Sequence, residues 1–377
     1  MEQLIDAPPD ATERDAELGE RRTSPVELLW DLVFVFAVTQ VTAMLYHDPN
    51  WTRLGEAMLV LALVWWAWSA FVWAANAQAT TSPTLRISLL LGTIAIFITG
   101  LAVPHAYGSE GVLFAVTYAV VRLGHLALYA DLSRRGSASW QAIAGFGAWT
   151  CVALVLLLAG SFMHGGWRVA LWAVAAAIDY AGPAWLTRER LRGLQSVAVE
   201  HFAERYGLFV IICLGESVVA IGVGAQAHLL DAEIVLGVAL ALIITGELWW
   251  AYFTRFAATA QERLRHVADP VLVAADAYSY VHLLIVAGII TFAVGAKLSV
   301  GGSSGPGGFA LAGGAGLYVA GQIGFAWRMV GAIDARRSAV AIALLALCPF
   351  ADDLARWLTA AIVSALLVCL CSLTSAR

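Results

Sequence analysis

The sequence predicts an all-α integral membrane protein with about twelve transmembrane helices. Of its 377 residues, 60% are hydrophobic and only 13% are charged, and the mean hydropathy is +0.78. A soluble domain carries about 25% charged residues. The apolar residues also come in runs of about 20, which is the length that a helix needs to cross a bilayer. This composition excludes a soluble enzyme and a disordered chain, and the net charge of −5 offers no basic surface for nucleic acid.

Each expected span is a largely apolar run of the chain. The runs are residues 26–46, 54–75, 84–103, 111–131, 139–159, 165–186, 206–224, 231–253, 270–296, 307–329, 337–350 and 354–374. The eleventh is short and ends at Pro349. Strand-type alternation does not compete with these runs, and open sheet edges cannot lie in lipid.

The basic residues predict how the spans are oriented. Seventeen of the 22 Lys and Arg residues fall in the amino-terminal tail, the even-numbered connections and the carboxyl terminus, four fall on the other side, and Arg122 lies inside a span. Because cytoplasmic loops carry the excess of Lys and Arg, we expect both termini to lie in the cytoplasm. The first 25 residues are polar and acidic, without the apolar core of a signal peptide.

The two halves of the chain resemble each other. The aromatic run Trp65–Trp68 recurs as Trp249–Tyr252, and Tyr118 recurs as Tyr318. The matching residues occur in the same order in both halves, which favours a 6 + 6 internal repeat. Six spans is an even number, so the halves would be parallel and related by an axis along the membrane normal.

This pattern predicts four segments. They are a disordered acidic cytoplasmic tail at 1–25, a first six-helix membrane half at 26–186, a cytoplasmic linker at 187–205 and a second six-helix membrane half at 206–377.

Several ionisable residues lie inside or well into the expected spans, where each costs roughly 2.5–3.5 kcal/mol on insertion scales. They are Asp31, Arg122, His125, Asp179, Glu216, Glu247 and Asp276. They must therefore face the protein interior, pair with one another or stay protonated. We expect Arg122 to pair with Asp31, Asp179 or Asp276, as a link between helices or as part of a site.

Helical spacing supports an interior position for most of them, because residues three or four apart share one face of a helix. The sets with this spacing are Glu27 with Asp31, the stripe Tyr118, Arg122, His125 and Tyr129, and Asp276 with Tyr280. Two plainer interpretations stay open. Glu27 could be a solvated acid at a helix start, and His125 could be a hydrogen-bonded core residue.

Glu216 is the carboxylate that is hardest to explain structurally. It lies about ten residues into its span, near the midplane, and has no partner nearby in the sequence. Gly215, Gly222 and Gly224 flank it and should allow close helix approach. We therefore expect it to carry the activity.

These observations give a set of candidate site residues. Glu216, Asp31 and Glu27 are candidate proton carriers or acids, and Arg122, His125, Asp179, Glu247, Asp276 and Tyr280 are candidate substrate-binding residues. The five cysteines lie in apolar runs without a CxxC or zinc spacing, so we expect no metal and no cofactor.

Two stretches resemble a known family. Ser24-Pro-Val-Glu-Leu-Leu-Trp-Asp-Leu-Val-Phe-Val-Phe-Ala-Val-Thr-Gln resembles the opening signature of the bacterial low-temperature-requirement A family, and His201-Phe-Ala-Glu-Arg-Tyr-Gly-Leu-Phe-Val-Ile-Ile-Cys-Leu-Gly-Glu-Ser resembles its second signature. The resemblance covers about residues 21–375. It implies a multi-pass protein of the bacterial plasma membrane, in a family named for growth in the cold. It also implies signature positions at Glu27, Asp31, His201, Glu204, Arg205, Gly215 and Glu216.

Three functions fit these features. A secondary transporter, which could be proton-coupled, fits twelve spans, parallel halves and buried carboxylates; without an ATP-binding P-loop, its energy would come from an ion gradient. A membrane-embedded enzyme on a lipid or isoprenoid would use a buried acid as proton donor and aromatic faces to stabilise cations. A non-catalytic envelope protein is the third. The partners are the lipid bilayer and an unidentified small molecule, ion or lipid, with no nucleic acid.

Overall fold

The computed structural model describes residues 23–78, 82–135, 140–183, 198–226, 229–254, 256–302 and 306–375. Across these residues the chain is helical and forms no strand. Nine helices in this part of the chain are long and apolar enough to cross a membrane. A helix lies at every one of the twelve expected positions, but three of them (α7, α15 and α16) fall short of that length or apolarity.

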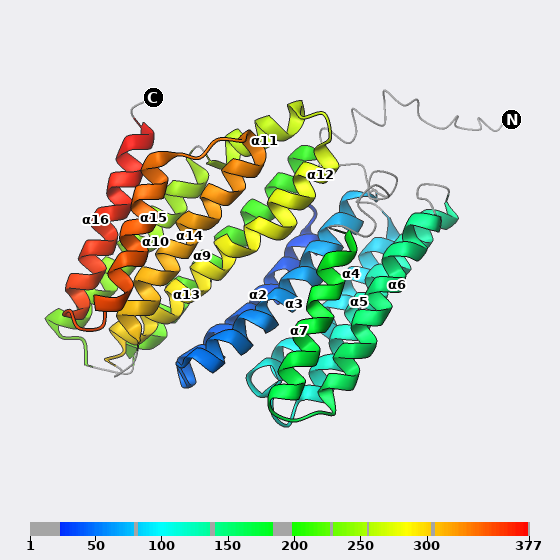
Figure 1. Cartoon of the computed structure of the whole chain (residues 1–377), viewed down its shortest axis with the longest axis horizontal. Coiled ribbons are helices and arrows are strands. Elements are labelled where there is room, and N and C mark those ends of the chain that lie inside the picture. Colours follow the sequence, from blue (N-terminus) through cyan, green and yellow to red (C-terminus); the bar gives the residue numbers. More distant parts are fainter. Residues whose placement is uncertain are drawn as a thin grey trace, which may run out of the picture.

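The helices form two groups that lie side by side (Figure 1). The first group contains α2 (Pro25–His47), α3 (Trp51–Asn76), α4 (Pro83–Ala102), α5 (Gly111–Arg134), α6 (Trp140–Ser161) and α7 (Gly166–Ala181). The second contains α9 (Val199–Gln226), α10 (Ala232–Phe253), α11 (Phe256–His266), α12 (Pro270–Ala274), α13 (His282–Val300), α14 (Gly307–Val330), α15 (Ala335–Leu347) and α16 (Arg356–Ser375). Short 3₁₀ turns follow α4 (Val103–His105) and α15 (Cys348–Phe350), and a π-helical segment, Ala275–Val281, joins α12 to α13.

The two groups meet where α2 and α3 pack against α9 and α13. The helix α2 begins with Pro25, and the Ser24 hydroxyl and amide both donate to Glu27 Oε2, at 2.7 and 2.8 Å, which caps the helix start. We call the two ends of the bundle the Pro25 end and the His47 end. The helix α16 ends at the Pro25 end as well (Figure 1).

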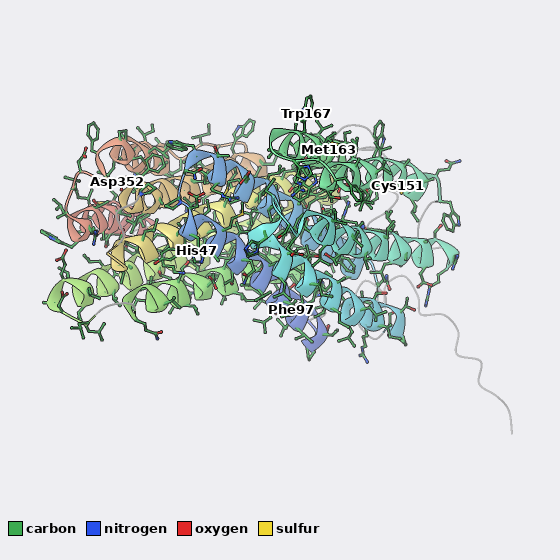
Figure 2. All side chains as sticks on the ribbon, turned by 90° about the horizontal axis from the view of Figure 1, so that it is seen from below. His47, Phe97, Cys151, Met163, Trp167 and Asp352 are labelled. Atoms are coloured by element: carbon green, nitrogen blue, oxygen red, sulfur yellow. The ribbon has the colours of Figure 1, made fainter. Side chains whose placement is uncertain are left out.

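Apolar side chains cover the outside of the bundle as well as its core. Trp30, Trp68 and Trp172 are fully buried, whereas Phe97 and Trp167 are 43% and 75% exposed on the outer surface (Figure 2). Large exposed apolar patches are rare on soluble monomers. This surface fits a protein whose helices face lipid.

Glycine brings α13 and α14 into main-chain contact. A Cβ atom on Gly295 would lie 2.2 Å from the Leu311 amide nitrogen, and one on Gly288 would lie 2.4 Å from that of Tyr318. Of the three glycines expected to allow a close approach of α9, only Gly224 does so, because a Cβ there would lie 2.9 Å from the Lys297 carbonyl oxygen. The expectation is wrong for Gly215 and Gly222, where a Cβ meets nothing within 4 Å.

Part of the predicted organisation falls outside the described residues. This applies to residues 1–22 of the expected tail and residues 187–197 of the expected linker. The remaining linker residues from Val199 onward are helical and form the first two turns of α9. Residues 201–205 therefore belong to the helix that also carries Glu216.

Candidate functional site

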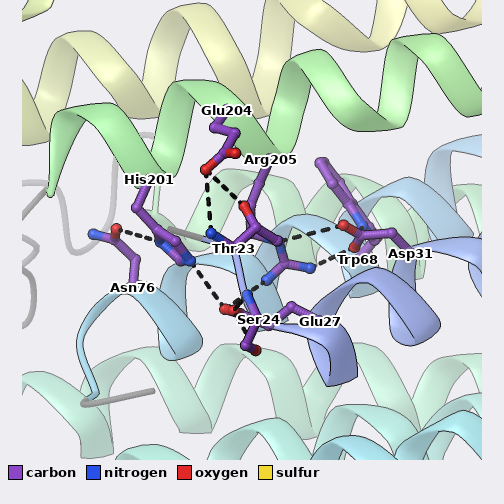
Figure 3. Close-up of polar contacts among 9 residues, drawn as sticks. All are labelled: Thr23, Ser24, Glu27, Asp31, Trp68, Asn76, His201, Glu204 and Arg205. Carbon is purple, nitrogen blue, oxygen red and sulfur yellow. Dashed lines mark hydrogen bonds and ion pairs between the residues drawn. The ribbon is translucent and has the colours of Figure 1, made fainter. Parts of the chain in front are cut away.

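Four ionisable side chains meet between α2 and α9 at the Pro25 end of the bundle (Figure 3). Glu27 and Asp31 come from α2, and His201 and Arg205 come from α9. Each pair is four residues apart and so lies on one helix face. All four are 0% exposed. We call these residues the charge cluster.

Arg205 is the centre of the charge cluster. Its guanidinium donates to both carboxylate oxygens of Asp31, through Nη2 to Oδ1 and through Nε to Oδ2 at 3.4 Å. Its Nη1 atom lies 3.5 Å from Glu27 Oε1. The Trp68 indole donates to Asp31 Oδ1 at 2.7 Å. Two donors therefore fix the Asp31 carboxylate, in the charge-assisted geometry that gives the stronger protein hydrogen bonds.

His201 connects the charge cluster to α3. Its Nε2 atom lies 3.1 Å from Glu27 Oε1, and its Nδ1 atom lies 3.3 Å from Asn76 Oδ1. An amide oxygen can only accept, so Asn76 favours a hydrogen on Nδ1. A second proton on Nε2 would then face Glu27.

The charges of the cluster do not balance without an added proton. Two carboxylates and one guanidinium sum to one negative charge when His201 is neutral, and one more proton on His201 or a carboxyl group brings the cluster to zero. Uncompensated charge is costly in a site without solvent. By this charge count, the cluster is neutral only when it holds one added proton.

A second buried ion pair lies inside the first helix group. Arg122 Nη2 lies 2.8 Å from Asp179 Oδ1, and the Thr150 hydroxyl donates to the same oxygen at 2.9 Å. The expected pairing of Arg122 is confirmed, with Asp179 as its partner. Asp276, another acid considered for it, pairs with Arg328 at 2.7 Å.

His125 and Tyr280, which the sequence places in distant spans, line one pocket between the two helix groups. We call it the aromatic pocket; its volume is about 40 Å³, and its lining includes Trp66, Ser69, Trp73, His125, Tyr129, Phe146, Ser279 and Tyr280. The interior stripe on α5 is confirmed, because Tyr118, Arg122, His125 and Tyr129 are all at most 3% exposed.

Glu216 lies outside the charge cluster and the aromatic pocket. This half-buried carboxylate accepts a hydrogen bond from Thr39 on α2 at 2.7 Å. Glu247 accepts from Ser364 at 2.7 Å, between α10 and α16. The predicted site residues are thus distributed over several places.

Asp276 and Tyr280 each bond to a different helix. Asp276 bonds to α14, whereas the Tyr280 hydroxyl donates to the Tyr180 carbonyl in the first group at 2.9 Å. The reason is the π-helical segment that contains both residues. A π-helix has more residues per turn than the α-helix on which the spacing argument depends.

Sequence reasoning from spacing alone missed His201 and Arg205, because it assigned them to a hydrated linker. The available signal was their own spacing of four, and the second family signature also pointed to them. Ser279 gave no such signal, because Ser is an ordinary residue in these helices.

Comparison with known proteins agrees with the resemblance of the two signatures. The model of the family described as bacterial low temperature requirement A protein (LtrA) matches residues 22–374. The chain belongs to the LtrA family. This LtrA protein is also 33% identical over 297 residues to the uncharacterized protein RA0937 of Rhizobium meliloti (strain 1021), which covers 76% of this chain and 72% of that protein. No solved structure matches the chain.

Proposed function

We propose that this LtrA-family protein is a secondary transporter of a small solute, coupled to protons through the charge cluster. One observation carries the proposal: a solvent-free cluster that needs one proton for neutrality joins the two helix groups. In secondary transporters, two halves move against each other around a central site. A proton held at their contact would couple that movement to the proton gradient.

The packing order within each group supports a 6 + 6 repeat. In the first group, α2 packs on α3 and α4, α4 on α5, α5 on α6, and α7 on α3 and α6. In the second group, α9 packs on α10 and α13, α13 on α14, α14 on α15, and α16 on α10 and α15. The packing order is the same when α2 to α7 are matched in turn with α9, α10, α13, α14, α15 and α16. Parallel repeats of this kind form the halves of known transporters.

A matched pair of hydrogen bonds also supports the repeat. The Tyr118 hydroxyl donates to the Leu63 carbonyl at 3.1 Å, and the Tyr318 hydroxyl donates to the Leu248 carbonyl at 2.6 Å. Each bond links two helices that correspond in the proposed repeat, α5 to α3 in the first group and α14 to α10 in the second. These two tyrosines are also equivalent in the sequence repeat.

The proposed orientation puts the charge cluster on the cytoplasmic side of the plasma membrane. The excess of Lys and Arg favours cytoplasmic termini, and α2 begins at the same end at which α16 finishes. The proton would then enter or leave the cluster from the cytoplasm.

The mechanism follows from the charge of the cluster. With the extra proton the cluster is neutral, and the contact between α2 and α9 is stable. Loss of that proton leaves one uncompensated negative charge without solvent, which destabilises the contact. Separation of the helices at the Pro25 end would admit water to the carboxylates and open a path for the solute.

Spin-label distances test this mechanism directly. Labels would be attached to cysteines at the exposed positions Gln141 on α6 and Arg263 on α11, after the five native cysteines are replaced. We expect a longer distance between the labels at pH 8 than at pH 5.5 in lipid nanodiscs. Glu27→Gln removes one negative charge, so the short distance should persist at both pH values.

The matched control is Glu233→Gln, which changes an exposed acid at the start of α10. It should keep the pH response of the parent protein. A distance that is the same at pH 5.5 and pH 8 in the parent protein would contradict the proposed function.

A further inference from the structure

We propose that the aromatic pocket binds the transported solute, and that this solute is a small uncharged molecule with a hydrogen-bond acceptor. The inference rests on the proposed function, because it names the site and the chemical class of the substrate. The pocket lies between the two helix groups. Trp66 and His125 come from the first group, and Ser279 and Tyr280 come from the second. A solute bound there would contact both moving parts.

Two of the residues that line the pocket each carry a buried polar atom without a partner. These atoms are Nε1 of Trp66 and Nδ1 of His125, on residues that are 6% and 1% exposed. Neither atom has a hydrogen-bond partner among the residues that the structure describes. Unpaired buried donors are rare in native proteins. A ligand in the pocket would supply the missing partner.

The lining defines the chemistry of that ligand. An indole N–H can only donate, so the ligand must carry an acceptor for Trp66. None of the described residues that line the pocket is Asp, Glu, Lys or Arg. An anion would therefore lose its hydration without gaining a counter-charge. The volume of about 40 Å³ restricts the ligand to a few non-hydrogen atoms.

The aromatic rings provide flat apolar surfaces for the remainder of such a molecule. Trp66 stacks on Tyr180 with ring centroids 4.1 Å apart and an angle of 25° between the rings. This stacking holds the Trp66 ring in place independently of its N–H. A planar amide or a similar neutral group would suit both the donor and the rings.

Helix α3 links Ser279, on the lining of the aromatic pocket, to the charge cluster. The Ser279 hydroxyl accepts from Trp73 at 2.8 Å and from Ser69 at 2.9 Å, both on α3. Ser279 lies in the π-helical segment, and such segments often occur at functional sites. Because Trp68 on the same helix α3 donates to Asp31, a ligand that shifts this segment would act on the charge cluster through α3.

A pair of probes of nearly the same shape tests the proposal. Acetamide is neutral and acetate is an anion, and both place a methyl group beside a carbonyl. Saturation-transfer NMR on the full chain in nanodiscs should detect acetamide binding, with acetate at least tenfold weaker. The measurement needs no gradient and no transport.

Two variants locate the binding site. Trp66→Phe keeps a ring against Tyr180 but removes the N–H, and should weaken acetamide binding about tenfold. His125→Phe is a second variant that removes Nδ1 and keeps a ring. The control is Trp167→Phe, the same Trp-to-Phe substitution at a residue that is 75% exposed. It should leave acetamide binding unchanged.

The outcomes separate this proposal from the proposed function. Three results would overturn the assignment of the solute site: equal binding of acetate and acetamide, no binding of acetamide, or full binding by both pocket variants. A pocket that holds only water would give no binding of acetamide. Acetamide binding at Trp66 without a pH-dependent distance change would support the site and contradict the transport mechanism. A pH-dependent distance change without acetamide binding would support the transport mechanism and contradict the solute site.

Discussion

Arg205 on α9 binds both carboxylate oxygens of Asp31 on α2 at a place that solvent does not reach. This ion pair joins the two helix groups, and Trp68 on α3 holds the same carboxylate. Its removal should therefore affect both the stability of the protein and the contact between the groups.

Arg205→Met should destabilise the protein by about 3–5 kcal/mol, because it leaves buried carboxylates without their cation. The double variant with Asp31→Asn should recover part of this loss. Arg265→Met is the control, since Arg265 pairs with Glu200 at the surface, where such pairs contribute about 0–1 kcal/mol. Thermal unfolding in detergent measures all three, and equal losses for Arg205→Met and Arg265→Met would contradict the expectation.

Arg122→Ala should also cost several kcal/mol, since Asp179 would then be buried without a cation. Its pair lies within the first group. We therefore expect a lower unfolding temperature but an unchanged pH response of the Gln141–Arg263 label distance. Asp179→Asn in the Arg122→Ala background should partly restore stability. Loss of the pH response in a folded Arg122→Ala protein would show that this pair belongs to the coupling machinery.

Gly295→Ala should destabilise the protein by about 1–3 kcal/mol or more, because the new methyl group meets the α14 main chain. Gly215→Ala is the matched control in α9, where a Cβ meets nothing within 4 Å. Alanine favours a helix over glycine by about 1 kcal/mol, so this control should not lose stability. Unfolding temperatures of the two variants decide the point.

Glu216→Gln should fold and melt like the parent protein but lose transport. Gln keeps an oxygen that can accept from Thr39, yet it cannot bind or release a proton. Thr39→Val tests the hydrogen bond alone and should retain transport. The measurement is the current of proteoliposomes when acetamide is added under a pH gradient. A current in Glu216→Gln equal to that of the parent would assign Glu216 to a structural link between α2 and α9.

The positions of the helices could be predicted from the sequence because the apolar runs were long. The residue at which α9 starts could not be predicted in this way. Polar residues from His201 to Arg205 look like a hydrated linker in the sequence. In the structure His201 and Arg205 are buried, because α2 supplies complementary acids. Only the partner helix, which is distant in the sequence, makes this segment part of the interior.

Several residues of the charge cluster and the aromatic pocket could be picked out from the sequence, but their arrangement could not. Spacing identified Glu27, Asp31, His125 and Tyr280, and charge balance limited the partner of Arg122 to three acids. Which helices face each other depends on side-chain packing between helices, which residue spacing along a single helix does not reveal. The π-helical segment added a further difference, because it changes the direction of Tyr280 relative to Asp276.

Asp31 and Arg205 are 174 positions apart, so α2 is synthesised long before α9. During that interval Arg205 cannot neutralise Asp31, and water is the better environment for an unpaired carboxylate. We therefore expect α2 to settle at its final depth only after α9 has been inserted. A ribosome-bound chain that stops before Val199 should keep residue 31 accessible to a water-soluble reagent, and access should end once α9 has been inserted.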